Sequence, residues 1–347
     1  MNLNSLTITP DLLKLIAEID EFKGSWRLLK TFNPERLKQL RYVATIESIG
    51  SSTRIEGAKL NDKAVEVLLN GLTSQSFASR DEQEVAGYAD VMDIIYQNYA
   101  DIPITENYIK QLHASLLHHS KKDYRHAGEY KKHPNNVEAF HADGSSAGII
   151  FETTSPFNTP MEMQQLVVWT RETLEDKSHH PLIVIGVFNV VFLAIHPFQD
   201  GNGRLSRVLS TLLLLKAGYS YLPYSSLESI IENSKDAYYL NLRRTQTTLK
   251  QQLPNWQPWI RFFLQAMKRQ KDHLAQKTEI NHSFDNLPIE SIQIMEYVNT
   301  HQRITVKIAE EICKIPRPAV KTRLSLLVEK GFLVRYGKAR GTWYARP

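Results

Sequence analysis

The chain has 347 residues, of which 42% are hydrophobic and 23% are charged, a composition typical of soluble globular proteins with two or more domains. The single cysteine, Cys313, excludes an intramolecular disulfide and a zinc site built from several thiolates. A formal net charge of +5 is too small for this length to indicate nucleic-acid binding by itself. The first thirty residues lack the regions of a signal peptide, and the apolar run 181–195 is short for a membrane span and is interrupted by Asn189. We therefore expect a cytoplasmic protein that does not cross a membrane.

Most of the chain repeats apolar residues at spacings of three and four, which is the pattern of amphipathic helices. Pro160 stands at the start of one such segment and Gly218 at the end of another, as is common for helix termini. The predicted helices cover 11–29, 34–57, 81–99, 105–119, 160–177, 204–218, 234–250 and 254–280.

One segment has a different pattern. The pieces "VEAF" (137–140) and "GIIFE" (148–152) are rich in residues that favour strands, and the Asp143–Gly144 turn signal lies between them. We predict a single hairpin at about 135–155. Because a lone hairpin is marginally stable, it must rest on the helical domain or act as a clamp.

A second domain is predicted after the polar stretch 281–288. Three short helical patterns and a strand–turn–strand pattern with glycines resemble a winged helix-turn-helix over 285–347. Its basic residues suit contacts with DNA phosphates: Arg317, Lys321, Arg323, Arg335, Lys338 and Arg340. The third helix lacks the Asn and Gln side chains that read bases, so a protein-interaction or homodimer module is the alternative.

The stretch "HPFQDGNGRLSR" (196–207) follows directly after the apolar run. Taken alone, "DGNG" is an ordinary turn between two helices. It is also suited to anion binding, because a glycine-rich turn at a helix N-terminus presents free N–H groups, and Gly201 and Gly203 allow a phosphate to approach closely. Arg204 and Arg207, three positions apart, can both face that anion.

Asp200 and His196 complete this chemical interpretation. A carboxylate beside phosphate oxygens is a typical arrangement for Mg²⁺, which makes Asp200 a candidate metal ligand. A histidine, with an ordinary pKa of about 6.5, can take a proton from an attacking hydroxyl, so His196 is a candidate general base.

The complete stretch resembles the signature of Fic-domain adenylyltransferases, His-Pro-Phe-x-Asp/Glu-Gly-Asn-Gly-Arg-x-x-Arg, at every fixed position. The resemblance extends over roughly residues 40–265. It implies an all-α Fic fold with a β-hairpin flap that docks the target, and an adenine pocket at Tyr238 and Tyr239. It also implies transfer of AMP from ATP, with Mg²⁺ and release of pyrophosphate, to Tyr, Thr or Ser hydroxyls of proteins, self-modification included.

The same resemblance implies a role for each residue of the signature. His196 is the general base, and Asp200 holds Mg²⁺ between the α- and β-phosphates. Arg204 and Arg207 grip the β- and γ-phosphates. The anion hole is formed by Gly201, Asn202 and Gly203.

The stretch "SSTRIEG" (51–57) has two interpretations. By itself it is the end of an amphipathic helix, with Glu56 as a solvated charge. It also resembles the family's inhibitory helix, Ser/Thr-x-x-x-Glu-Gly/Asn, from Ser52 to Gly57. That resemblance implies that Glu56 forms a bidentate pair with Arg207 in the place of the ATP γ-phosphate.

The predicted organisation is an N-terminal helical region with the inhibitory helix at about 40–57, a catalytic core, a helical linker and the winged helix: 1–100, 101–265, 266–284 and 285–347. The alternatives to AMP transfer are a DNA-binding regulator that uses the last domain, and a Fic-fold enzyme that transfers phosphate or removes AMP.

Two further features are predicted to have no role in the site. The histidine pairs 118–119 and 179–180 are adjacent in sequence and do not share a helix face, so we expect no shared metal there. The charged stretch 121–133 is predicted to be a solvated loop. The family often has Gly-x-Tyr/Phe-Arg at this point, and Lys131 in place of the arginine weakens the prediction of a role for that residue at the flap.

Overall fold

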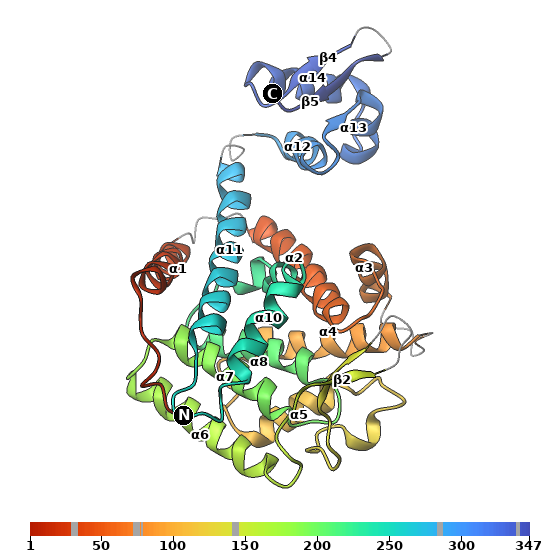
Figure 1. Ribbon diagram of the computed structural model, residues 1–347. Helices are drawn as coiled ribbons and strands as arrows, with labels where there is room; N and C mark the ends of the chain where they lie inside the picture. The colour runs from red at the N-terminus through yellow and green to blue at the C-terminus, as the bar shows by residue number, and fades with distance from the viewer. Residues whose placement is uncertain (29–33, 72–76, 78, 141–145, 283–286, 338–340) are drawn as a thin grey trace. The chain divides into compact units, whose positions relative to one another are not determined.

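The computed structural model describes residues 1–28, 34–71, 77, 79–140, 146–282, 287–337 and 341–347. It divides into two compact units, Met1–Leu274 and Ala275–Pro347, whose helices and strands are labelled in Figure 1. Each unit has its own hydrophobic core. The division falls inside α11 (Gln257–His282), within the segment 266–284 that the sequence suggested as a helical linker.

The first unit is mainly helical, and its described strands form one antiparallel hairpin in which Val137 pairs with Phe151. The predicted fold class, a mainly helical domain with a single hairpin, is confirmed. Besides α11, the helices are α1 (Pro10–Leu28), α2 (Pro34–Ile55), α3 (Asp62–Asn70), α4 (Arg80–Asn98), α5 (Glu106–Leu116), α6 (Thr159–Asp176), α7 (Pro181–Ile195), α8 (Asn202–Lys216), α9 (Leu227–Glu232) and α10 (Lys235–Gln246), and the strands are β1 (Val137–Phe140) and β2 (Ser146–Phe151).

Helix α7 is the centre of this unit, because every residue from Leu182 to Ile195 is buried. It lies against α6, α8 and α10. Its one polar side chain, Asn189, donates through Nδ2 to the Ser210 hydroxyl of α8 over 2.7 Å, so the amide nitrogen has an acceptor inside the core. Gly186 gives α11 room to approach, and Trp259 of α11 donates to the Gly186 carbonyl over 2.8 Å. The apolar run is therefore a buried core helix that holds the segment following it in a fixed place.

Two short helices of this unit were not predicted. Helix α3 begins at Asn61, whose side chain accepts from the Ala64 N–H, but only Val65 of this helix is buried. Helix α9 has six residues and is capped by Ser226. Elements this short, with few buried positions, give too weak a periodic signal to identify from sequence.

The second unit contains α12 (Ile289–His301), β3 (Arg303–Ile304), α13 (Val306–Cys313), α14 (Arg317–Glu329), β4 (Val334–Tyr336) and β5 (Trp343–Ala345). The strands form an antiparallel sheet in the order β3–β5–β4, and β3 is too short to have been predicted. Three helices and a terminal hairpin are the elements that the winged-helix prediction requires. The predicted wing residues Lys338 and Arg340 lie outside the described residues, as does the Asp143–Gly144 turn of the flap.

Candidate functional site

The signature segment forms the connection between α7 and α8. His196 caps α7 in the left-handed conformation (φ 53°), and Gly201 precedes α8 in the same region (φ 78°). The buried Asn202 side chain closes this loop, because its Oδ1 accepts from the Phe198 N–H at 2.9 Å and its Nδ2 donates to the Phe198 carbonyl at 2.7 Å. The Asn202 amide is thus used to shape the loop, and the anion hole predicted here is left to backbone N–H groups.

A cavity of about 590 Å³ opens above this loop, a size typical of small-molecule sites. The structure brings most of the predicted site residues to its wall: Glu56, His196, Asp200, Gly201, Asn202, Gly203, Arg204, Tyr238 and Tyr239. Ser52 and Arg207 are not among the described residues that line it. The cavity also has contributions from α4, through Arg80 and Glu84, and from the start of the flap, through Asn135.

His196 is held as a neutral imidazole. Burial lowers the pKa of His196 to about 4, and the nearby Lys131 charge acts in the same direction. Its Nδ1 lies 3.3 Å from the Leu193 carbonyl. A carbonyl can only accept, so Nδ1 carries the proton and Nε2 has the lone pair. This is the tautomer that a proton acceptor requires.

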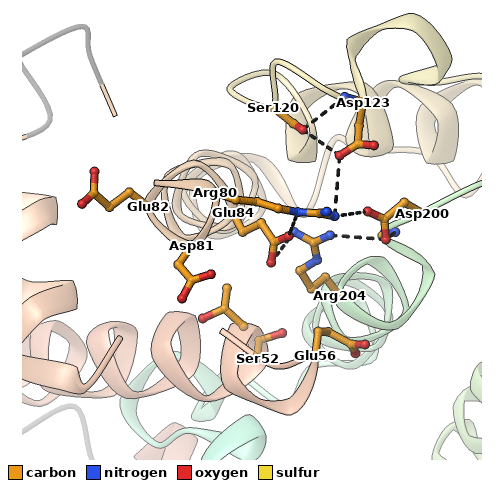
Figure 2. Close-up of polar contacts among 12 residues, drawn as sticks. Ser52, Glu56, Arg80, Asp81, Glu82, Glu84, Ser120, Asp123, Asp200 and Arg204 are labelled. Carbon is orange, nitrogen blue, oxygen red and sulfur yellow. Dashed lines mark hydrogen bonds and ion pairs between the residues drawn. The ribbon is translucent and has the colours of Figure 1, made fainter. Parts of the chain in front are cut away.

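Asp200 is an ionised carboxylate between two arginines (Figure 2). Arg80 approaches it at 2.8 Å and Arg204 at 3.7 Å, and the Gly201 N–H donates to it at 2.6 Å. Although burial acts to raise it, the pKa of Asp200 is lowered because these three groups stabilise the anion. Among the described residues no cluster of three His, Cys, Asp or Glu side chains could hold a metal. Asp200 therefore fits Mg²⁺ only as one ligand beside phosphate oxygens, which is how it was predicted to act.

Arg204 is a buried guanidinium at the first turn of α8. It pairs with Glu84 of α4 at 3.3 Å, and Figure 2 shows both beside Asp200. Its Nε has no hydrogen-bond acceptor in the part of the chain that the structure describes, and Nη1 is the atom that forms the ion pair with Glu84. Arg204 lines the cavity, where a guanidinium charge favours the binding of an anion such as a phosphate.

Arg207, one turn further along α8, is 3% exposed and faces the end of α2. Its Nε donates to the Ser52 hydroxyl and its Nη2 to the Ser52 carbonyl, each over 2.8 Å. The same Nη2 lies 2.8 Å from one oxygen of Glu56. The predicted bidentate pair is therefore wrong, because Glu56 meets Arg207 through one oxygen and Ser52 occupies the Nε side of the guanidinium. Nη1 has no acceptor among the described residues.

The Glu56 carboxylate lies between Arg207 and the cavity. Glu56 follows the last residue of α2 and lines the cavity wall. A Cβ added at Gly203 would overlap the carboxylate, so the two are in close contact. Arg54, on the last turn of α2, forms a bidentate pair with Glu232 at 2.7 and 3.0 Å and a second pair with Asp62 at 2.9 Å. These ion pairs fix the end of the helix that presents Glu56.

Tyr238 and Tyr239 both lie on α10 at the cavity, but in different environments. Tyr238 is buried against Trp259, with ring centroids 5.5 Å apart, and burial raises the pKa of Tyr238 to about 12. Tyr239 is 37% exposed. Tyr239 is therefore the ring that a nucleobase can reach, while Tyr238 supports it from the core.

Several residues of the site were not predicted. His113 of α5 is fully buried, stacks on Phe198 at 3.8 Å between ring centroids, and reaches the Asp200 carbonyl at 3.0 Å. Its spacing from Ile109 and Leu116 on the apolar face was an available sequence signal. Arg80 had no such signal, and the one signal for Lys131, its place in the Gly-x-Tyr/Phe-Arg pattern, was discounted because the arginine is missing. The prediction of a solvated loop at 121–133 is wrong at Asp123 and Lys131, which are both buried.

One histidine of each pair has a carboxylate partner. His119 pairs with Asp90 at 2.7 Å, and His180 pairs with Asp20 at 2.9 Å.

In the second unit, two of the predicted DNA-contacting residues are engaged inside the unit. Arg317 pairs with Glu310 at 3.6 Å and Arg323 with Glu290 at 3.2 Å. DNA binding and homodimer formation stay predictions. No described helix is long and apolar enough to cross a membrane.

Comparison with known proteins agrees with this geometry. The Fic/DOC family matches over residues 103–214. The chain is 27% identical over 218 residues to Protein adenylyltransferase Fic from Drosophila mojavensis, covering 61% of this chain and 40% of that protein. It is 28% identical over 206 residues to the protein of that name from Drosophila grimshawi, covering 59% and 40%. The match thus spans about two fifths of the length of these curated relatives.

Solved structures show the same fold. A Fic family protein from Desulfovibrio desulfuricans superposes with a TM-score of 0.62 at 21% identity, covering 99% of this chain and 98% of that one. A Fic-domain signaling protein from Bacteroides thetaiotaomicron gives 0.60 at 24% identity, covering 74% and 94%. With the signature loop at the cavity, these likenesses show that the chain has the Fic fold and that its residues 103–214 match the Fic/DOC family.

Proposed function

We propose that this chain is a protein adenylyltransferase, which transfers AMP from ATP to a hydroxyl of a protein side chain, its own included, and which Glu56 restrains. The observation that carries the proposal is the loop between α7 and α8. It places a neutral imidazole, a glycine-rich helix N-terminus and the buried Arg204 guanidinium at one cavity. The adenylyltransferase relatives support this reaction at the level of the family.

The chemistry follows from the positions of these groups. The hydroxyl of the target attacks the α-phosphorus of ATP, and its proton passes to Nε2 of His196. The bond from the α-phosphorus to the bridging oxygen breaks, and pyrophosphate leaves. The backbone N–H groups at the start of α8 and Arg204 bind the phosphate oxygens, so positioning and charge stabilisation supply most of the rate.

Asp200 is the residue that would hold Mg²⁺. When bound beside the phosphates, the ion neutralises the charge that develops on the leaving group. Arg80 approaches the same carboxylate at 2.8 Å and is about half exposed. Its guanidinium can therefore move to solvent or to a phosphate when the nucleotide enters.

The restraint is a competition for Arg207. This guanidinium makes one charge-assisted contact with Glu56 on the side that faces the cavity. A γ-phosphate would need the same donor, and a single Nη2 cannot serve both anions at full strength. We infer that ATP binds with its phosphates turned away from the productive position while Glu56 is in place.

The test incubates the wild type, Glu56→Gly and Glu56→Gly/His196→Ala with Mg²⁺ and ATP labelled at the α-phosphorus. We expect label on the chain itself and on added proteins with Glu56→Gly, little with the wild type, and none with the double variant. Label that persists after loss of His196 would remove the base from the mechanism.

A further inference from the structure

Lys131 is a buried lysine beside the signature loop, and the proposed chemistry does not use it. It is 3% exposed. Its ammonium donates to Asn135 Oδ1 at 2.8 Å, to the Thr153 hydroxyl at 2.9 Å and to the Ile195 carbonyl at 2.9 Å. An ammonium has three N–H donors, and each of them has an acceptor here. A buried ammonium with all three donors paired is held in one position and holds its three acceptors in place.

Asn135 extends the contacts of Lys131 along the loop. Its Oδ1 accepts from Lys131 and, at 3.0 Å, from the Thr153 hydroxyl. Its Nδ2 donates to the His196 carbonyl at 3.2 Å and to the Phe198 carbonyl at 2.6 Å.

The two residues together bind four consecutive carbonyls of the chain. Lys131 holds Ile195 through its ammonium and Pro197 through its backbone N–H at 2.8 Å, and Asn135 holds His196 and Phe198. Every peptide carbonyl from 195 to 198 therefore has a donor from the segment 131–135. Because the peptide planes on both sides of the His196 Cα are fixed, the direction of its side chain is fixed as well.

His196 requires such support. It adopts a left-handed backbone conformation at φ 53°, which a residue with a side chain adopts only when its surroundings hold it there. It also caps the carboxyl end of α7, where helix carbonyls lack partners and a positive charge is favourable. The Lys131 ammonium on the Ile195 carbonyl meets both needs.

We propose that Lys131 and Asn135 are positioning residues for His196, which hold the α7–α8 loop in the shape that aims the imidazole into the cavity. The inference rests on the proposed function of His196. The same contacts tie the loop to the base of the flap, because Asn135 precedes β1, Thr153 follows β2, and the Thr153 N–H donates to Asn136 at 3.1 Å. One hydrogen-bond network thus fixes the positions of both the proposed general base, His196, and the first residues of the flap.

The network also acts on His196 through charge. The charged groups that face the imidazole are Lys131, Glu56 and Asp200, and Glu162 faces Lys131. Burial lowers the pKa of Lys131 to about 8, so the ammonium is charged at neutral pH. Removal of that charge raises the pKa of His196 towards its ordinary value, while removal of the Asn135 amide leaves the charge in place.

The test compares Lys131→Met, Lys131→Arg and Asn135→Ala in the Glu56→Gly background, with Lys132→Met, an exposed neighbour, as the matched control. We expect Lys131→Met to lower the self-labelling rate at saturating ATP about ten- to hundredfold with little change in the KM for ATP, as for a reacting group misplaced by about an ångström. Lys131→Arg, which keeps the charge and several donors, should recover part of the rate. Lys132→Met should behave like the background.

The pH dependence separates positioning from a purely structural role. Lys131→Met should shift the acid limb of kcat/KM to higher pH, and an NMR titration of the His196 ring should show the same rise in pKa. Asn135→Ala should lower the rate and leave the acid limb in place. The NMR readout does not depend on AMP transfer, so it still tests Lys131 if the Glu56→Gly background proves inactive, which would count against the proposed function alone.

Two results would overturn the inference: a Lys131→Met variant with the rate and the ring titration of its background, or an equal loss in Lys132→Met. If Lys131→Met does not fold, as judged by thermal melting, Asn135→Ala decides, because an unchanged rate there would show that the grip on the His196 and Phe198 carbonyls is not needed.

Discussion

Replacing Glu56 with glycine should raise AMP transfer, and the structure sets the size of the effect. The carboxylate makes one contact with Arg207, at 2.8 Å, on a guanidinium that is 3% exposed, while the Glu56 side chain is 32% exposed. A hydrogen bond to a charged group contributes about 1.5–3 kcal/mol, and a coupling of that size corresponds to about 10- to 150-fold. Glu56 lies beyond the end of α2, so the glycine should leave the helix intact.

The assay measures initial rates of label transfer from α-labelled ATP over a range of ATP concentrations. Glu56→Gln is the matched variant, because it keeps an oxygen that can accept from Arg207 and loses only the charge. We expect the order glycine, glutamine, wild type, from fastest to slowest. Equal rates for all three across the ATP range would show that Glu56 is a solvated charge at a helix end, and the reasoning from competition would then be wrong.

Four further outcomes follow from the site. Arg207→Ala should be inactive, and adding Glu56→Gly should not rescue it, because the restraint and the phosphate contact share one guanidinium; a rescued double variant would refute this. Asp200→Ala in the Glu56→Gly background should lose activity, and EDTA should abolish label transfer by the Glu56→Gly variant itself. Label transfer without metal would contradict the role of Asp200. The pKa of His196, about 4, should appear in the acid limb of kcat/KM, since the imidazole is a base only above its folded-state pKa; an acid limb near pH 6.5 would contradict the lowered pKa. Between these two pH values the unfolded chain binds a proton at His196 that the folded chain does not, so this residue should also cost stability as the pH falls from 6.5 to 4, as measured by denaturant unfolding.

The catalytic segment could be predicted from sequence because its information is local. The twelve residues at 196–207 contain the base, the turn glycines and the helix N-terminus in consecutive order. The strand β1 likewise has the predicted bounds, since Val137 and Phe140 favour strands and the polar residues Asn135 and Asn136 precede it. Glu56 and Arg207 are 151 positions apart, and only the resemblance joined them; their single-oxygen contact depends on the position of Ser52.

The supporting residues could not be predicted, because their contacts with the catalytic segment are not local in the sequence. Arg80 reaches Asp200 from 120 positions away, and nothing near Arg80 distinguishes it from a surface arginine. Lys131 stands beside Lys132 in a charged stretch, yet one is buried with three acceptors and the other is exposed. Which of two adjacent lysines meets the end of a core helix is decided by tertiary packing, and a charge pattern does not encode it.

The most direct test of AMP transfer with His196 as base uses Glu56→Gly in two parallel reactions, with ATP labelled at the α- or at the γ-phosphorus. Transfer of AMP predicts that only the α-label becomes bound to protein, that the γ-label leaves as pyrophosphate, and that His196→Ala abolishes the bound label. Protein-bound γ-label would instead identify a phosphotransferase and contradict the account.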